Sequence, residues 1–323
     1  MKPIRRTAAA TAVLIYALIV LGALVRTTDS GLSCPDWPTC YGHWVPLPSD
    51  LAEIPNLGYS YGQIMLEWVH RLIAGVILGP LVLVLAVMTF RRRRDRPALA
   101  VAGVALLLLL LAQGALGGLT VLDRNSPWSV AIHLGNALLV LTVTLGIYAG
   151  AAGWRASGGG DGRLLLTLAV AAWGLALLAT MSAAVTAKTG SSLACTTWPL
   201  CDGAIVPDLS DGGVRIHFAH RVLAAATGLA LLLLFWRSRV ATGTPAGVRR
   251  LAALAAALVV LQIGLGGLVV LLEVPVWSAV LHQAAGVLTF ATVALLMWRC
   301  RPLGGGVGRP LPGGSDGLAL RGA

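Results

Sequence analysis

Four histidines lie inside long apolar stretches of this chain, at His70, His133, His220 and His282. An ionisable side chain within such a stretch is costly and normally needs a partner or a cofactor. Two neutral imidazoles on facing helices present two axial nitrogens to one metal ion. Zinc sites need three or four protein ligands, whereas a heme brings its own ring nitrogens and needs only axial ones. The histidines therefore predict bis-histidine heme, with hydrogen bonds to neighbouring helices as the alternative.

Small residues near these histidines would leave room for a planar macrocycle. They include the LGGL motifs at 116–119 and 265–268, together with Gly75, Gly135, Ala137, Gly228 and Gly286. Glycines at helix interfaces also serve simple close packing, which is the alternative reading.

Two arginines directly follow a histidine, Arg71 after His70 and Arg221 after His220. A guanidinium group near the membrane boundary is suited to pair with the carboxylates of heme propionates. The alternative is that these side chains snorkel to the lipid headgroups.

Glu67 lies three residues before His70, on the same face of the expected helix. A carboxylate beside a heme could move protons, which makes Glu67 the candidate catalytic residue. The structural alternative is that it orients Arg71 or a loop. The second half has His217 at this position, for which we expect a hydrogen-bonding role, with assistance to the second heme as the alternative. This asymmetry predicts chemistry in the first half and electron transfer in the second.

Two cysteine pairs share the spacing C-x5-C, Cys34 with Cys40 and Cys195 with Cys201. Zinc ribbons prefer shorter spacings, so we expect structural disulfides outside the membrane. The alternative is a redox-active pair that undergoes thiol–disulfide exchange, for which Cys34 and Cys40 are the better candidates. Cys300 is expected to be free. His43 lies in the same loop as the first pair and is expected to be solvated.

The chain contains an internal repeat. Residues 31–46 align with 192–207, and EWVHRLIA at 67–74 aligns with HFAHRVLA at 217–224. The segments that end at His133 and His282 also align. Each half has an even number of spans, so the repeat is parallel rather than inverted.

Composition sets the class of protein. Of the 323 residues, 57% are hydrophobic and only 11% are charged, and the mean hydropathy is +0.82. We predict an all-α integral membrane protein with eight transmembrane helices, arranged as two tandem pseudo-symmetric four-helix bundles. The bundles comprise residues 1–153 and 164–298, joined by a cytoplasmic linker at 154–163 and followed by a flexible cytoplasmic tail at 299–323. The expected spans are 8–25, 64–90, 97–121, 129–152, 164–186, 216–236, 251–272 and 278–298.

The net charge of +11 is explained by membrane topology. Basic residues concentrate in alternate connections, of which the arginine run at 91–96 is the clearest. The positive-inside rule then places both termini in the cytoplasm and the cysteine loops on the outer face of the plasma membrane. Nucleic acid is not expected as a partner.

These motifs together resemble the heme A synthase family: GLSCPDWPTCYG, the E-x-x-H-R at 67–71, the H-R at 220–221, and the single histidines 133 and 282. The resemblance covers residues 8–298. It implies an enzyme that oxidises a methyl group of heme O to the formyl group of heme A by successive hydroxylation, for oxidases of the cytochrome aa3 type. It also implies that His70 and His133 hold heme O beside Glu67, whereas His220 and His282 ligate a permanent heme b. Heme O synthase and the cytochrome oxidase assembly machinery are the implied partners, with an unknown electron acceptor and a possible homo-oligomer.

Two other functions are open from the sequence alone. The first is a quinone-linked electron-transfer cytochrome with two b hemes, which has less need of a carboxylate in only one half. The second is a transporter, although the spans show few proline breaks and no paired interrupted helices.

Overall fold

The computed structural model describes residues 1–55, 57–154 and 160–301, and all of its regular structure is helical apart from two isolated bridges. Eight helical segments of this described part are long and apolar enough to cross a membrane, which confirms the predicted class of fold. The spans are α1 (Lys2–Thr27), α3 to α4 (Tyr61–Phe90), α5 (Pro97–Leu122), α6 (Pro127–Ala151), α7 (Gly160–Lys188), α8 (Gly212–Val240), α9 (Ala246–Leu271) and α10 (Val276–Cys300).

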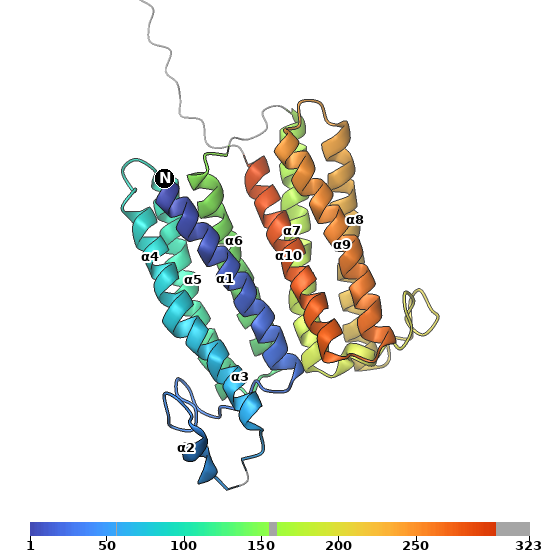
Figure 1. Cartoon of the computed structure of the whole chain (residues 1–323). Helices are drawn as coiled ribbons and strands as arrows, with labels where there is room; N and C mark the ends of the chain where they lie inside the picture. Colours follow the sequence, from blue (N-terminus) through green and yellow to red (C-terminus); the bar gives the residue numbers. More distant parts are fainter. Residues whose placement is uncertain (56, 155–159, 302–323) are drawn as a thin grey trace, which may run out of the picture.

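The helices form two groups that share a core. In the first group, α1 and α5 each pack against α4 and α6. In the second group, α8 and α10 each pack against α7 and α9. The groups meet where α1, α6, α7 and α10 touch, as Figure 1 shows. Phe290 of α10 and Leu138 of α6 are buried in one apolar cluster there. The division into two tandem bundles, with its boundaries, stays a prediction.

Short sequence signals set where the helices begin. Prolines stand in the first turn of α1, α5 and α6, where their missing N–H costs nothing. The side chains of Ser60, Ser126 and Asp211 accept hydrogen bonds from the first-turn amides of α3, α6 and α8. Side chains on the outside of the bundles are apolar and exposed, as in Val13, Leu108 and Leu229, which fits a surface that faces lipid.

The second span is interrupted, and its equivalent in the other half is not. The α-helix α3 (Tyr61–Leu72) passes into a π-helical segment at Ile73–Leu78 before α4 (Gly79–Phe90) continues. Pro80 in the first turn of α4 lacks an N–H, and Gly79 donates instead to the carbonyl oxygen of Ala74. In contrast, α8 is one continuous α-helix.

Both ends of the described chain lie at one end of the molecule, and the long loops with the cysteines lie at the other (Figure 1). Besides the spans, the structure adds a short helix, α2 (Pro48–Ala52), and a 3-10 turn at Ser191–Leu193. Most helices run a few residues past the predicted spans. Residues 155–159 of the predicted linker and 302–323 of the predicted tail lie outside the described residues.

Candidate functional site: two histidine pairs beneath disulfide loops

Each half carries a loop closed by a disulfide, Cys34–Cys40 in the first and Cys195–Cys201 in the second. We call residues 34–40 the first disulfide loop and 195–201 the second. Cys300 is free and buried. His43 follows the first loop, is about half exposed, and lies 3.7 Å from a carboxylate oxygen of Asp50 through its Nδ1.

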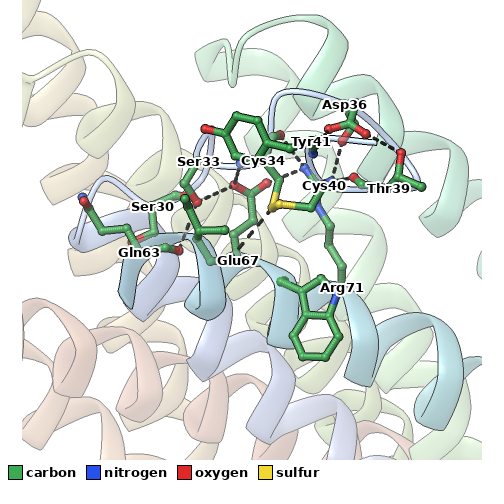
Figure 2. Close-up of a disulfide and its surroundings, with 12 residues drawn as sticks. Ser30, Ser33, Cys34, Asp36, Thr39, Cys40, Tyr41, Gln63, Glu67 and Arg71 are labelled. Carbon is green, nitrogen blue, oxygen red and sulfur yellow. Dashed lines mark hydrogen bonds and ion pairs between the residues drawn. A yellow bond between two sulfur atoms is a disulfide. The ribbon is translucent and has the colours of Figure 1, made fainter. Parts of the chain in front are cut away.

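Glu67 holds the first disulfide loop onto α3, as Figure 2 shows. It is 4% exposed, and its Oε2 accepts hydrogen bonds from the Cys34 N–H at 2.9 Å and the Ser33 hydroxyl at 3.0 Å. Its Oε1 pairs with Arg71 at 2.6 Å. The hydrogen bonds of this carboxylate among the described residues therefore come from the loop, from Ser33 just before it and from Arg71, as the structural alternative for Glu67 expected.

Arg71 also holds this loop, and we call the hydrogen bonds of Glu67 and Arg71 to the loop the clamp. Its guanidinium donates to the carbonyl oxygens of Cys34 at 2.9 Å and Thr39 at 2.8 Å, and also to that of Asp36. Both terminal nitrogens are thus engaged with the loop backbone. The predicted role of Arg71 toward heme propionates stays a prediction.

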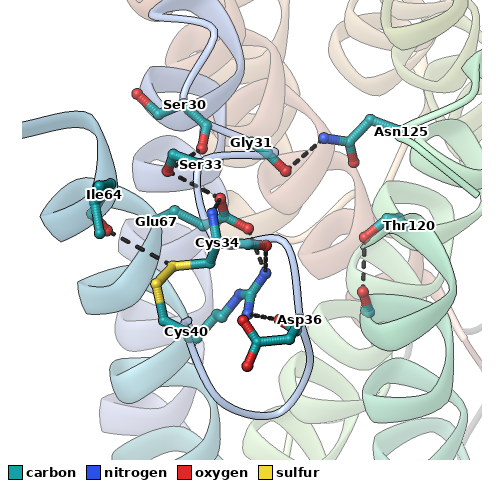
Figure 3. Close-up of polar contacts among 12 residues, drawn as sticks. Ser30, Gly31, Ser33, Cys34, Asp36, Cys40, Ile64, Glu67, Thr120 and Asn125 are labelled. Atoms are coloured by element: carbon teal, nitrogen blue, oxygen red, sulfur yellow. Dashed lines mark hydrogen bonds and ion pairs between the residues drawn. A yellow bond between two sulfur atoms is a disulfide. The ribbon is translucent and has the colours of Figure 1, made fainter. Parts of the chain in front are cut away.

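The loop is also fixed from within and from its neighbours. The Asp36 carboxylate accepts hydrogen bonds from Thr39, Tyr41 and Gly42. Partial burial raises the pKa of Asp36, but these hydrogen bonds outweigh it, and the pKa lies below its ordinary value. In Figure 3 the Asn125 side chain, between α5 and α6, donates to the Gly31 carbonyl just before the loop. The loop therefore has a defined position above the helix ends.

His217 takes the place of Glu67 in the second half. Its Nδ1 lies 3.2 Å from the Cys195 backbone nitrogen, and its Nε2 lies 3.2 Å from Arg221 Nε. Arg221 donates to the carbonyl oxygens of Cys195 and Leu200. The two halves thus use one clamp with different chemistry, and His217 has the hydrogen-bonding surroundings that the sequence predicted.

His220 and His282 come together in the second half. Both line one cavity of about 660 Å³ between α7, α8, α9 and α10. Pockets for cofactors typically measure about 300–1,000 Å³, so this cavity is of suitable size. The Nδ1 of His282 and the Oε1 of Gln262 are buried there without a hydrogen-bond partner. Such unsatisfied buried atoms indicate a site built for a further polar or metal-containing group.

The first-half histidines lie on equivalent helices. The ring of His70 in α3 packs against Gly22 of α1, where an added Cβ would lie 3.2 Å from its Cε1. The Nδ1 of His70 is buried without a partner. His133 of α6 packs against Gly117 of α5, and both of its ring nitrogens lie within 3.3 Å of the Gln113 amide nitrogen.

Three polar neighbours of the histidines were not among the predicted residues. Gln113 contacts His133, and Gln262 contacts His282 at 3.3 Å. The Ser182 hydroxyl lies 2.9 Å from Nδ1 of His220. The two glutamines are 149 residues apart, which is the spacing of the LGGL repeat. Extending that alignment by three residues toward the N-terminus would have found them. Ser182 has no counterpart in the first half, where Leu21 aligns, so the repeat gives no signal for it.

The two glycines of each LGGL motif have separate tasks. The first, Gly117 or Gly266, lies against a histidine ring, and the second, Gly118 or Gly267, lies against a tryptophan of the disulfide loop. A Cβ on Gly266 would lie 2.9 Å from Cε1 of His282, and one on Gly267 would lie 2.9 Å from Cδ2 of Trp198. The motif therefore allows both the histidine ring and the tryptophan of the disulfide loop to pack closely against the helix. Gly286 lies against Gln262, and Gly135 lies against Met181 at the interface between halves.

The fold and the site define a multi-pass membrane protein with two pairs of membrane histidines, each pair below a clamped disulfide loop. The chain matches the family of cytochrome oxidase assembly proteins (COX15-CtaA) over residues 5–294 and belongs to that family.

Relatives resemble the chain over nearly their whole length. The heme A synthase of Shewanella oneidensis is 30% identical, in an alignment that covers 89% of this chain and 94% of the relative. That of Symbiobacterium thermophilum is 30% identical and covers 94% of this chain and 97% of the relative. The heme A synthase of Paramagnetospirillum magneticum is 30% identical, in an alignment that covers 90% of this chain and 91% of the relative.

Proposed function

We propose that this chain is a heme A synthase, which oxidises the methyl group of heme O to the formyl group of heme A by successive hydroxylation. The observation that carries the proposal is the membership of the family, with relatives of this name aligned along almost the entire chain. The change from methyl to formyl is an oxidation, in which the carbon gains oxygen and loses hydrogen. The site must therefore release protons and pass electrons to an acceptor.

His70 and His133 are the proposed axial ligands of the substrate heme O. The unpartnered Nδ1 of His70 and the glycines behind both rings support this role.

The residues of the second half fit a resident heme b. His220 and His282 line the same cavity, and unsatisfied polar atoms lie beside it. Ser182 donates its own hydroxyl hydrogen to the Ala179 carbonyl, so its oxygen accepts the Nδ1–H of His220. That arrangement leaves the Nε2 lone pair of His220 available to a metal. When bound, heme b supplies one-electron transfer.

Glu67 is the proposed proton-handling residue of the first half. It is buried between the disulfide loop and Arg71, one turn from His70. Its engagement with the loop also favours the second candidate function, a diheme b electron-transfer cytochrome in which Glu67 is structural only.

We further propose a plasma-membrane location with both termini in the cytoplasm. The heme O would then come from a heme O synthase and the product would pass to the oxidase assembly machinery. Electrons would leave through an acceptor still to be identified, and homo-oligomers are compatible with the apolar outer surface.

The test is production of the chain in a host that makes heme O but no heme A, followed by chromatography of extracted hemes. The wild type should yield heme A beside heme b. His70→Ala and His133→Ala should lose heme A and keep the low-spin heme b spectrum, whereas His220→Ala and His282→Ala should lose that spectrum. His43→Ala, in an exposed position, is the matched control.

Glu67→Gln separates the two candidate functions. As an enzyme the variant should accumulate and bind heme but form no heme A. Two equivalents of heme b and no heme O or A in the wild type would instead establish the electron-transfer cytochrome.

A further inference from the structure

Arg26 belongs to the first half of the chain but lies at the heme cavity of the second. It is in the last turn of α1 (Lys2–Thr27), at the loop end of the molecule. There α1 packs against α10, and Arg26 lines the cavity that His220 and His282 also line. A cation at the rim of a cavity within a membrane is costly unless an anion accompanies it.

Most N–H donors of the Arg26 guanidinium have no hydrogen-bond acceptor among the described residues. Among the described residues, its guanidinium donates one hydrogen bond, from Nη2 to Gln283 Oε1 at 2.8 Å, and forms no ion pair. A guanidinium has five N–H donors in a planar fork that matches a carboxylate. Asp29 also lines the cavity and is exposed; its backbone N–H donates to the Arg26 carbonyl oxygen at 3.3 Å, but among the described residues its carboxylate forms no ion pair with the Arg26 guanidinium. Gln283 directly follows His282, so it places Arg26 next to the histidine.

The other two cations of this cavity differ from Arg26 in their contacts or their chemistry. Arg221 donates to His217 and to the loop carbonyls of Cys195 and Leu200. Lys188, at the end of α7, is half-buried and has no side-chain hydrogen bond among the described residues, but its ammonium is a point charge without the planar fork of a guanidinium. Of the two guanidinium groups at this cavity, Arg26 is therefore the one with most of its donors left for a ligand among the described residues.

The first half has no counterpart of this contact. By the repeat register Arg26 aligns with Ala187, and Gln283 aligns with Leu134. At the equivalent interface, between α6 and α7, Met181 packs against Gly135 instead. That contact is apolar, unlike the hydrogen bond between Arg26 and Gln283.

We propose that Arg26 binds a propionate carboxylate of the resident heme, so that the first half of the chain completes the heme b site of the second. This inference rests on the proposed function, because it takes the group in the cavity to be a heme. A cation beside the propionate disfavours the more positive ferric state, so its removal should lower the midpoint potential of that heme.

The experiment is a redox titration of the low-spin heme in purified full-length protein, with heme content per chain measured in parallel. Two neutral variants are used, R26Q and the apolar R26M, which suits a membrane helix if R26Q does not accumulate. R26K keeps the charge without the fork. The control is R215Q, since Arg215 is exposed and donates to its own loop at Leu209 and Ser210.

The neutral variants should show a more negative midpoint potential and less heme per chain than R215Q, and R26K should lie between them and the wild type. Neutral variants that match R215Q in both measurements would overturn the inference, as would an R26K shift equal to that of R26Q. A wild type without any low-spin heme would instead refute the proposed function itself.

Discussion

The clamp on the disulfide loop is one design with two different acceptors. In the first half the Glu67 carboxylate accepts from Ser33, Cys34 and Arg71. In the second, both nitrogens of His217 face N–H donors, from Cys195 and Arg221. A neutral imidazole has only one acceptor nitrogen, so it satisfies one of the two donors, whereas a carboxylate satisfies both.

His217→Glu should therefore be stabilising. The carboxylate would accept both hydrogen bonds and pair with Arg221, a gain of about 1 kcal/mol for one restored hydrogen bond. Thermal unfolding in detergent should show a higher midpoint with the heme b spectrum intact. The reference is the wild-type chain. A midpoint below that of the reference would show that the second loop does not accept a carboxylate.

Ser182 should set the electronic character of the resident heme. Its oxygen accepts from Nδ1 of His220, which makes the ligating nitrogen more electron-rich. Ser182→Ala should raise the midpoint potential of the low-spin heme, opposite in sign to the effect of the neutral Arg26 variants. Ser210→Ala, in an exposed loop, serves as the comparison. Equal potentials in the two alanine variants would remove Ser182 from this role.

At the scale of elements, helix α9 contains a matched pair of glycines. A Cβ on Gly266 would lie 2.9 Å from Cε1 of His282, whereas one on Gly264 would have no neighbour within 4 Å. Both alanine variants gain helix propensity, about 1 kcal/mol each. Gly266→Ala should nevertheless lose the resident heme spectrum because the imidazole is displaced, and Gly264→Ala should keep it. Retention of the spectrum in both variants would mean that His282 has room to move.

The sequence predicted the elements well because membrane spans and an internal repeat leave strong signals. The four histidines, the LGGL motifs and the paired cysteines all stood out by their register between the halves. The repeat could not reveal residues that break it. Ser182, Arg26 and the π-helical segment each lack a counterpart in the other half, and only packing between distant helices gives Arg26 and Ser182 their neighbours. The clamp of Glu67 on the loop backbone also depends on the folded path of the loop, which no spacing encodes.

For the whole molecule, the distribution of arginines makes a prediction about topology. The loop that contains Asp95 lies at the end of the molecule where both described ends of the chain lie, and Ser210 lies at the end with the disulfide loops (Figure 1). In intact cells a membrane-impermeant maleimide should label Ser210→Cys, whereas Asp95→Cys should react only after the membrane is opened. The native chain is the background, since Cys300 is buried and the other four cysteines form disulfides. The reverse labelling pattern would invert the proposed orientation.

The π-helical segment at Ile73–Leu78 changes the direction in which side chains point around the axis of the second span. Each residue of an α-helix advances the side chain by about 100° around the axis, so removing one residue from this segment would rotate everything on one side of it by that angle. Glu67, His70 and Arg71 all lie on the same side, within α3. The segment therefore sets the direction in which the side chains of α3 point relative to those of α4. A shift there would move the whole group together, and leave the uninterrupted α8 of the other half untouched.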